Sequence, residues 1–400
     1  MKSLDPQSRW TLWLMSAFVA FGPLSTDMYL PALPSLVAYF DTTLPAVQWT
    51  LSAYLIGFAV FHLLCGPMAD RFGRKPILLG GIALFTIACV GCALSETVES
   101  LVFWRFIQGI SACVGPTLGR AMARDIYGPT QAAKALGYMA AIMAIAPVIA
   151  PLLGGWMLTF TGWQAIFWSL AGYGLVALIT VWLVLPETLP RPTQFKLSVI
   201  LANYRFLLGH KHFVISTLGI ATMYSGAFAF ISGSSFVLID FMGVPPEHFG
   251  WWFMLIVAGY MGGSLFTARL AHRLDPVQTM IGGAVLAASS AGIMAVLGAI
   301  GWHHPLAVVL PMVFYTAAVG STMPQAMSVA LAPFADMAAT ASALLGFLQM
   351  GTAALAGAFV GSHLDGTAIP MALTMMSGGL VAAGGFWLLR SASDNKRFVE

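Results

Sequence analysis

The sequence predicts an all-α polytopic membrane protein with twelve transmembrane helices in two pseudo-symmetric bundles of six. Hydrophobic residues make up 59% of the 400-residue chain and charged residues only 8%, whereas a soluble surface normally needs about a quarter charged residues. Proline, glycine and charge divide the chain into apolar runs of about 20 residues, the length that crosses a bilayer. All but one of the 18 Lys and Arg residues fall at the termini or in alternate connections between these runs.

The N-terminal bundle, residues 1–186, is expected to contain the first six crossings. Its first apolar run is longer than the core of a signal peptide and lacks a small-residue cleavage site, so it should remain as a helix. The expected crossings of this bundle are 10–37, 45–66, 76–94, 98–119, 132–158 and 163–185.

The longest connection, residues 187–211, separates the two bundles. It begins with prolines and then becomes amphipathic, which predicts a helix on the cytoplasmic membrane surface. The C-terminal bundle, residues 212–400, should contain crossings at 212–232, 249–268, 277–299, 305–328, 340–362 and 368–390. Two joined six-helix halves with a site between them are a recurrent plan of transporters.

The cations predict the orientation of the chain, because cationic connections stay in the cytoplasm. Both termini are therefore expected inside. The net charge of +3 would be neutralised by anionic lipid headgroups. No basic stripe with interleaved aromatic residues is present, so nucleic acid is not expected as a partner.

Asp27 and Arg105 are the ionisable residues that lie deepest in the expected crossings. At 1.5 Å per residue, Asp27 lies roughly 15 Å from the outer end of the first crossing and Arg105 roughly 10 Å from that of the fourth, with Gln108 one turn further in. If these crossings are neighbours, Asp27 and Arg105 can approach each other, with Gln108 as a hydrogen-bonding partner. Burial disfavours a charged carboxylate and a guanidinium favours it, a balance that suits a proton carrier. The alternative is a purely structural ion pair.

The cytoplasmic connection from Gly66 to Pro76 contains glycines around an aspartate, which a merely positive loop does not need. Gly66 is expected to permit close approach of two helices. Asp70 should face a helix N-terminus or one of three cations. The three cations are Arg71, Arg74 and Arg124. Asp125 is placed to pair with Arg71 or Arg74.

The expected fifth crossing carries two prolines and a glycine pair: Pro147, Pro151, Gly154 and Gly155. This pattern predicts a kink and a tight interface, and an ordinary bent span is the alternative. Some polar and aromatic side chains within the crossings should line a substrate cavity, although aromatic residues at helix ends more often anchor at the interface. The candidates are Tyr29, Tyr54, Tyr224, Ser225, Tyr260, Tyr315 and Gln325. The four cysteines are expected as buried thiols, and neither a metal nor a cofactor is expected.

These motifs resemble the major facilitator superfamily. Gly66–Pro76 resembles its loop signature, Arg105–Gly109 its helix-four signature, and the proline-rich fifth crossing its antiporter signature. Ser25–Pro34 and Gly162–Phe167 are similar to the bicyclomycin and chloramphenicol resistance branch of the twelve-span drug:proton antiporters.

The resemblance implies a monomeric multidrug efflux antiporter in the bacterial inner membrane, driven by the proton gradient and working by alternating access. It implies that Asp27 carries protons, that Arg105 couples them to transport, and that Asp70, Arg74 and Asp125 act as a conformational latch. The expected partners are neutral or monocationic lipophilic drugs, protons and membrane lipid. A proton symporter for uptake of a small solute is the alternative function. An enzyme is disfavoured because the crossings offer a single deep acid.

Overall fold

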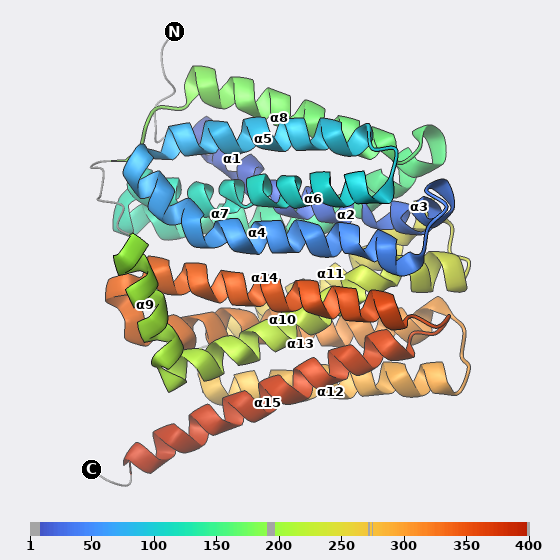
Figure 1. Cartoon of the computed structure of the whole chain (residues 1–400). Helices are drawn as coiled ribbons and strands as arrows, with labels where there is room; N and C mark the ends of the chain where they lie inside the picture. Colours follow the sequence, from blue (N-terminus) through green and yellow to red (C-terminus); the bar gives the residue numbers. More distant parts are fainter. Residues whose placement is uncertain (1–8, 190–196, 271–272, 274, 398–400) are drawn as a thin grey trace. The chain divides into compact units, whose positions relative to one another are not determined.

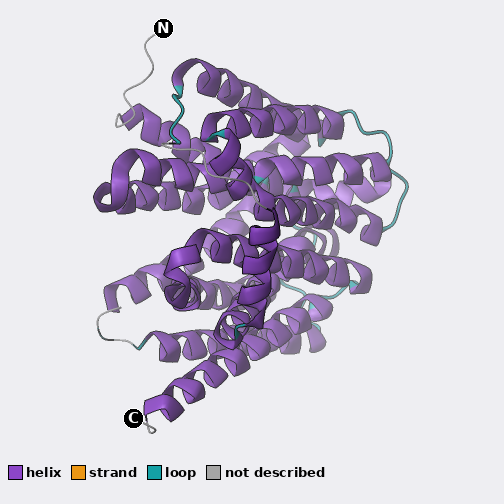
Figure 2. Cartoon of the chain, turned by 60° about the vertical axis from the view of Figure 1, so that its left-hand side comes forward, coloured by secondary structure: helices purple, strands orange, loops and turns teal. Residues whose placement is uncertain are grey.

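The computed structural model describes residues 9–189, 197–270, 273 and 275–397, and all regular structure in these residues is helical (Figure 2). Ten helical stretches of this part are long and apolar enough to cross a membrane. One of them, Pro305–His363, contains two helices. The first predicted crossing is absent from the ten because it is broken into short pieces. The merged stretch and the broken first crossing account for the difference between ten stretches and twelve predicted crossings. The prediction of an all-α polytopic membrane fold is confirmed.

The chain divides by its internal contacts into two compact units. Unit 1 contains Met1–Leu197 and the short segment Pro246–Gly250. Unit 2 contains Ser198–Pro245 and Trp251–Glu400.

Unit 1 begins with a broken helical segment where one continuous helix was predicted. Its pieces are α1 (Arg9–Val19), α2 (Phe21–Asp27), the 3₁₀ helix η1 (Leu30–Ala32) and α3 (Leu33–Tyr39). Pro31 has no N–H to donate to the carbonyl of Asp27, four residues earlier, and α2 ends at Asp27. The prediction of an unbroken helix over 10–37 is therefore wrong, and proline is the physical reason.

The rest of unit 1 consists of long helices (Figure 1). They are α4 (Leu44–Phe72), α5 (Arg74–Ala93), α6 (Val98–Ala112), α7 (Val114–Thr161) and α8 (Gln164–Val184). Helix α7 spans parts of two predicted crossings, and its backbone leaves helical angles at Gly128, with φ 64° and ψ 179°. In this unit α4 packs on α6, α5 on α8, and α1 on α7.

Unit 2 begins with α9 (Leu197–Gly209), which lies in the connection that was predicted to form an amphipathic helix. Tyr204 and Leu207 are the buried residues of α9, and burial raises the pKa of the Tyr204 hydroxyl to about 12. The remaining elements are α10 (Lys211–Ser235), the π-helix η2 (Phe236–Phe241), α11 (Pro246–Leu270), α12 (Pro276–Ala299), α13 (Pro305–Leu331), the 3₁₀ helix η3 (Ala332–Met337), α14 (Ala338–His363) and α15 (Ile369–Arg397). The first residue of α9, Leu197, and the first residues of α11, Pro246–Gly250, belong to unit 1. Helix α10 packs on α13, α14 and α15.

The predicted loop around Asp70 is mostly helical. Helix α4 continues to Phe72, a single glycine, Gly73, makes the turn with φ +102°, and α5 begins at Arg74. A Cβ atom at Gly66 would meet nothing within 4 Å. The prediction that Gly66 permits a close helix approach is therefore wrong. The position that requires glycine for its backbone conformation is Gly73.

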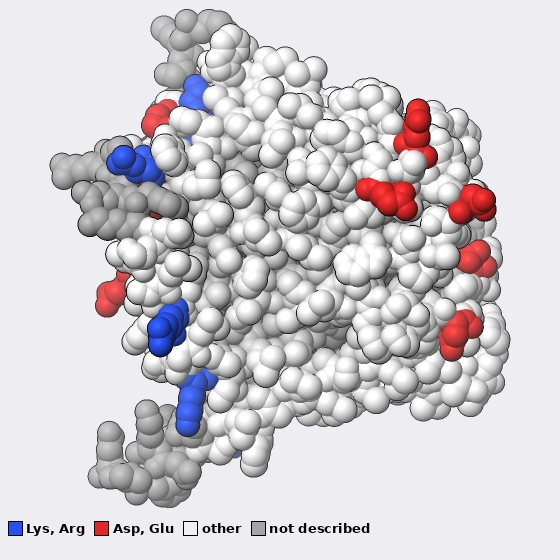
Figure 3. Space-filling view, viewed as in Figure 1, with Lys and Arg blue, Asp and Glu red and all other residues white. Residues whose placement is uncertain are grey.

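On the face shown in Figure 3, charged side chains gather near the helix ends of each unit, and the surface between them is almost free of charge. In unit 1, Arg74 and Lys75 begin α5, whereas Glu96 and Glu99 follow its other end. Lys2, Arg191 and Lys196, which contributed to the predicted orientation, lie outside the described residues. The cytoplasmic location of both termini stays a prediction.

Two glycines allow α4 and α6 to approach closely. A Cβ atom at Gly57 would overlap the carbonyl oxygen of Phe106, and one at Gly109 would overlap the carbonyl oxygen of Tyr54. Small residues at such a contact bring the backbones of membrane helices together. This contact holds the segments that carry Tyr54 and Arg105 side by side.

Replacement of Gly109 with Ala is expected to destabilise the protein by about 1–3 kcal/mol, because the added methyl group must push two backbones apart. Thermal unfolding in detergent measures the effect as a lower Tm. Gly80→Ala is the matched control, since a Cβ atom at Gly80 in α5 meets nothing within 4 Å. Equal Tm values for the two variants would show that the α4–α6 contact tolerates expansion.

Candidate functional site

Arg105, on α6, is completely buried, with none of its surface exposed. Its Nη1 donates to the carbonyl of Ser25 (3.0 Å) and to Oε1 of Gln108 (2.6 Å). Its Nε donates to the carbonyl of Thr50 (3.4 Å). Arg105 therefore joins α6 to α2 and α4 through backbone carbonyls, and its predicted hydrogen bond with Gln108 is present.

Three aromatic rings surround the guanidinium of Arg105. Its Cζ lies 4.5 Å from the ring centroid of Tyr54, 4.7 Å from that of Tyr29 and 5.9 Å from that of Phe167. The Tyr29 hydroxyl is 2.9 Å from Oγ1 of Thr50. Cation–π attraction contributes about 2 kcal/mol or more in desolvated sites. We call Tyr29, Tyr54 and Phe167 the aromatic cage.

Phe167 was not among the predicted site residues, although it belongs to the Gly162–Phe167 motif. Its ring lies 5.4 Å from that of Tyr29 and 6.0 Å from that of Trp163. A phenylalanine on an apolar helix has no sequence feature that separates a cage residue from an ordinary core residue. The Gly162–Phe167 motif was therefore the sequence feature that could have identified Phe167 as a site residue.

Asp27 is the last residue of α2, and it is only 6% exposed. Among the described residues its carboxylate accepts one hydrogen bond, from Oγ1 of Thr26 (3.0 Å). No salt bridge joins it to Arg105, whose donors reach backbone carbonyls and Gln108 instead. The expected approach of the two charges does not occur in this structure.

The separation of Asp27 from Arg105 has a simple geometric cause. Tyr29 presents its ring to Arg105, and residues two apart on helical backbone point to different sides. A carboxylate two residues before Tyr29 is therefore directed away from the guanidinium. The structure buries both residues, but depth along a helix does not specify the direction in which a side chain points.

Gln108 extends the polar group around Arg105 to α5. Its Nε2 donates to Sγ of Cys89 (3.0 Å), while its Oε1 accepts from Arg105. The four cysteines are free and buried, which confirms their interpretation as buried thiols. The contact with Cys89 was not predicted.

The predicted cavity residues are divided between the two units. Tyr29 and Tyr54 belong to the aromatic cage of unit 1. In unit 2, Tyr315 donates to the carbonyl of Met223 (3.0 Å) and Ser225 to that of Ala221 (2.7 Å), so both hydroxyls have partners within the unit. The others, Tyr224, Tyr260 and Gln325, are partly buried, and Oε1 of Gln325 makes no hydrogen bond in the described part. Their contact with a substrate stays a prediction.

The expected latch residues meet at Arg74. Its Nη1 lies 2.6 Å from Oδ1 of Asp70, and its Nε lies 3.1 Å from Oδ2 of Asp125. Arg71 and Arg124 are exposed and take no part in these two salt bridges. Of the predicted alternatives, Arg74 is thus the cation that contacts both acids.

The glycine pair on α7 forms tight contacts, as its sequence indicated. A Cβ atom at Gly154 would overlap the carbonyl oxygen of Met28, the residue directly after Asp27, and one at Gly155 would overlap that of Pro246. The departure from helical angles in α7 occurs at Gly128 rather than at Pro147 or Pro151. Gly154 therefore holds α7 against the segment that carries Asp27.

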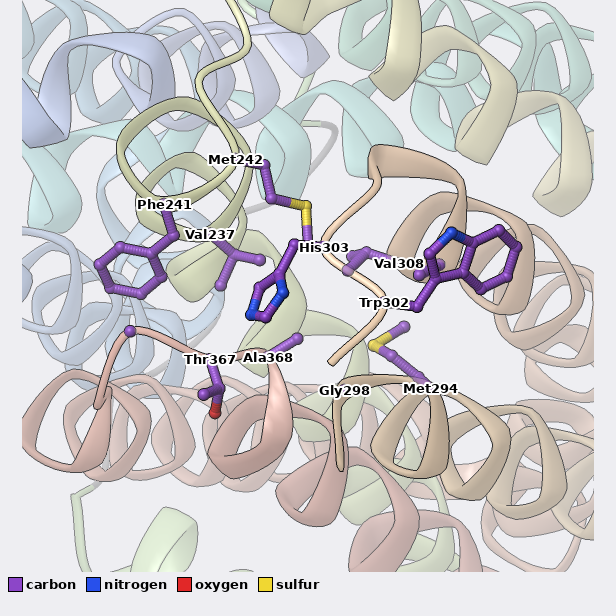
Figure 4. A pocket seen from close by; sticks show the side chains of 12 residues that line it. Val237, Phe241, Met242, Met294, Gly298, Trp302, His303, Val308, Thr367 and Ala368 are labelled. Atoms are coloured by element: carbon purple, nitrogen blue, oxygen red, sulfur yellow. The ribbon is translucent and has the colours of Figure 1, made fainter. Parts of the chain in front are cut away.

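A small pocket in unit 2 lies where the connections η2–α11, α12–α13 and α14–α15 meet (Figure 4). Met242, Met294, Trp302 and His303 are among its lining residues. The volume of this pocket is about 20 Å³, whereas drug-binding pockets usually measure about 300–1,000 Å³. This pocket is too small for a drug-sized molecule.

The family model of the Major Facilitator Superfamily matches residues 13–358. The chain is 30% identical over 380 residues to the uncharacterized MFS-type transporter YdgK of Bacillus subtilis, covering 94% of each protein. It is 28% identical over 398 residues, or 97% of each protein, to the bicyclomycin resistance protein homolog of Haemophilus influenzae. It is 32% identical over 340 residues, or 84% of each protein, to the multidrug resistance protein MdtL of Escherichia coli.

A solved bacterial homologue of the human lysosomal transporter Spinster, in an inward-facing conformation, has the same fold. It aligns with a TM-score of 0.75 and 16% identity over 96% of this chain and 97% of that one. The chain is a multi-pass membrane transporter and not an enzyme. The family match and the full-length relatives together confirm the resemblance seen in the sequence motifs: the protein belongs to the major facilitator superfamily.

Proposed function

We propose that this protein is a proton-coupled multidrug efflux antiporter of the bacterial inner membrane, with both termini in the cytoplasm. Its proposed substrates are neutral or monocationic lipophilic compounds of the bicyclomycin and chloramphenicol kind, exported by a monomer through alternating access. The names of the relatives, a bicyclomycin resistance protein homolog and a multidrug resistance protein, support drug export.

The observation that carries the proposal is the environment of Asp27. Its carboxylate is buried, accepts a hydrogen bond from Thr26, and has no salt bridge among the described residues. A charged carboxylate in the membrane interior is costly unless it is paired. A group in this position gains from taking up a proton when it faces the acidic side and releases the proton when water reaches it from the other side.

The other site residues receive roles that fit their contacts. Arg105 and Gln108 tie α2, α4, α5 and α6 together, so movement of any of these helices reaches the segment that contains Asp27. Arg74 holds Asp70 and Asp125 together, and we propose that this latch stabilises the outward-open state.

The proton gradient supplies enough free energy for this exchange. One proton that crosses about 100 mV contributes roughly 2.3 kcal/mol, and one pH unit adds about 1.4 kcal/mol. The sum sustains a gradient of about two to three decades for a neutral drug. A dication exchanged for one proton would move against the membrane potential, and such drugs are therefore expected to be poor substrates.

Inverted membrane vesicles that contain the protein are expected to accumulate a labelled drug such as chloramphenicol when respiration acidifies their interior. An uncoupler should abolish the accumulation, and vesicles without the protein should show none. If energised vesicles instead lose drug that was loaded beforehand, the protein is an uptake symporter. Flux that is insensitive to the uncoupler would contradict proton coupling altogether.

A further inference from the structure

Glu187, three residues after α8, places its carboxylate at the first residues of α5. Its Oε1 accepts from the backbone N–H of Arg74 (3.0 Å), and its Oε2 accepts from that of Lys75 (3.2 Å). Oε1 also accepts from the N–H groups of Thr188 and Leu189, both at 2.9 Å. One carboxylate thus accepts hydrogen bonds both from the N-terminus of α5 and from the two residues that follow Glu187.

The contact is reciprocal, because α5 also contributes to the end of α8. Nζ of Lys75 donates to the carbonyl of Trp182 (3.1 Å), in the last turn of α8. A carboxylate at a helix N-terminus and an ammonium at a C-terminus both interact favourably with the helix dipole. They also satisfy backbone groups that have no partner inside the helix. The two helix ends therefore cap each other.

Gly73 makes room for this contact. It is the N-cap residue of α5 and has no side chain with which to cap the helix. A Cβ atom at this position would lie 2.5 Å from Oε2 of Glu187. The turn between α4 and α5 thus depends on a distant residue for the cap that Ser, Thr, Asp or Asn usually supplies.

The capped residue is the one on which the latch depends. The backbone N–H of Arg74 is held by Glu187, and its side chain bridges Asp70 and Asp125. We propose that Glu187 is a positioning residue of the latch, which fixes the backbone of Arg74 so that its guanidinium reaches both aspartates. Because Glu187 also binds its own following residues, the same contact fixes where the connection toward α9 leaves unit 1.

Amide hydrogen exchange of the full-length protein in detergent tests the cap directly. In Glu187→Gln an amide group replaces one acceptor oxygen with a donor, so the amides of Arg74 and Lys75 are expected to exchange about fivefold faster, the loss typical of an N-cap. Glu187→Ala should give the same result. The matched control is Glu99→Gln in the first turn of α6, where Thr97 supplies the cap. Unchanged exchange at the start of α5 in both Glu187 variants would overturn the proposal.

A double-mutant cycle tests the link to the latch. This part rests on the proposed function, and it uses drug accumulation in inverted vesicles. Glu187→Gln is expected to lower the maximal rate about threefold to tenfold without changing KM, and to have no further effect in an Arg74→Gln background. Independent, multiplying effects would refute action through Arg74. If exchange accelerates but the unmodified protein transports no drug, the cap stands and the proposed function fails.

Discussion

Replacement of Asp27 with Asn is expected to abolish proton-driven drug accumulation, a loss of at least about a hundredfold. Asparagine keeps the size of the side chain and an oxygen that accepts from Thr26, but it cannot bind and release a proton in the working pH range. The fold should therefore persist while the coupling is lost. Drug susceptibility of a pump-deficient host and accumulation in inverted vesicles measure the effect.

Asp41→Asn provides the control for this experiment. Asp41 is exposed and lies in a turn with φ +46°, a conformation that Asn tolerates well. The same chemical change there should leave resistance and Tm unaltered. A second measurement determines the affinity for drug as a function of pH. The affinity should change with pH in the unmodified protein and stay constant in Asp27→Asn. Resistance that survives the Asp27 substitution would remove this residue from the proton pathway.

Replacement of Arg105 with Lys is expected to reduce transport about thirtyfold to a hundredfold, although the positive charge is retained. The guanidinium serves two backbone carbonyls and Gln108 from a planar fork and lies between aromatic rings. A lysine ammonium cannot reproduce the fork or the stacking. The loss of these contacts corresponds to about 2–3 kcal/mol. The maximal rate and the Tm should both fall, because Arg105 also joins α2, α4 and α6.

Arg269→Lys is the matched control, because Arg269 is exposed near the end of α11. It should leave the transport rate and Tm within experimental error of the unmodified protein. Full transport by Arg105→Lys would show that a positive charge alone is sufficient at this position. A Tm loss without a transport loss would limit Arg105 to a role in packing.

Much of the candidate site could be predicted because burial of charge in a membrane is costly. An aspartate and an arginine within apolar runs stand out for that reason, and the structure places both in the interior of unit 1. The contact of Arg74 with Asp70 and Asp125 was among the predicted alternatives, because each acid was expected to pair with one of the nearby cations.

Other features depended on side-chain direction, which depth and spacing do not specify. Asp27 and Arg105 lie on the predicted segments, yet the guanidinium binds carbonyl oxygens and aromatic rings instead of the carboxylate. Gly66 lies in the loop motif, but Gly57 and Gly109 make the close contact between α4 and α6. A glycine motif indicates that two helices pack closely in that region. Which glycine makes the contact depends on the facing helix.

By itself, the sequence determined the all-helical membrane fold, the family, and the buried ionisable residues, because the cost of placing polar groups in lipid acts on each residue whatever its neighbours are. The tertiary structure decided the aromatic cage around Arg105, the isolation of Asp27 from it, and the cap that Glu187 places on α5. These features join residues far apart in the chain, such as Arg74 and Glu187, and depend on the rotation and exact end of each helix. Hydrophobic pattern does not encode either quantity, since lipid and protein interior are both apolar.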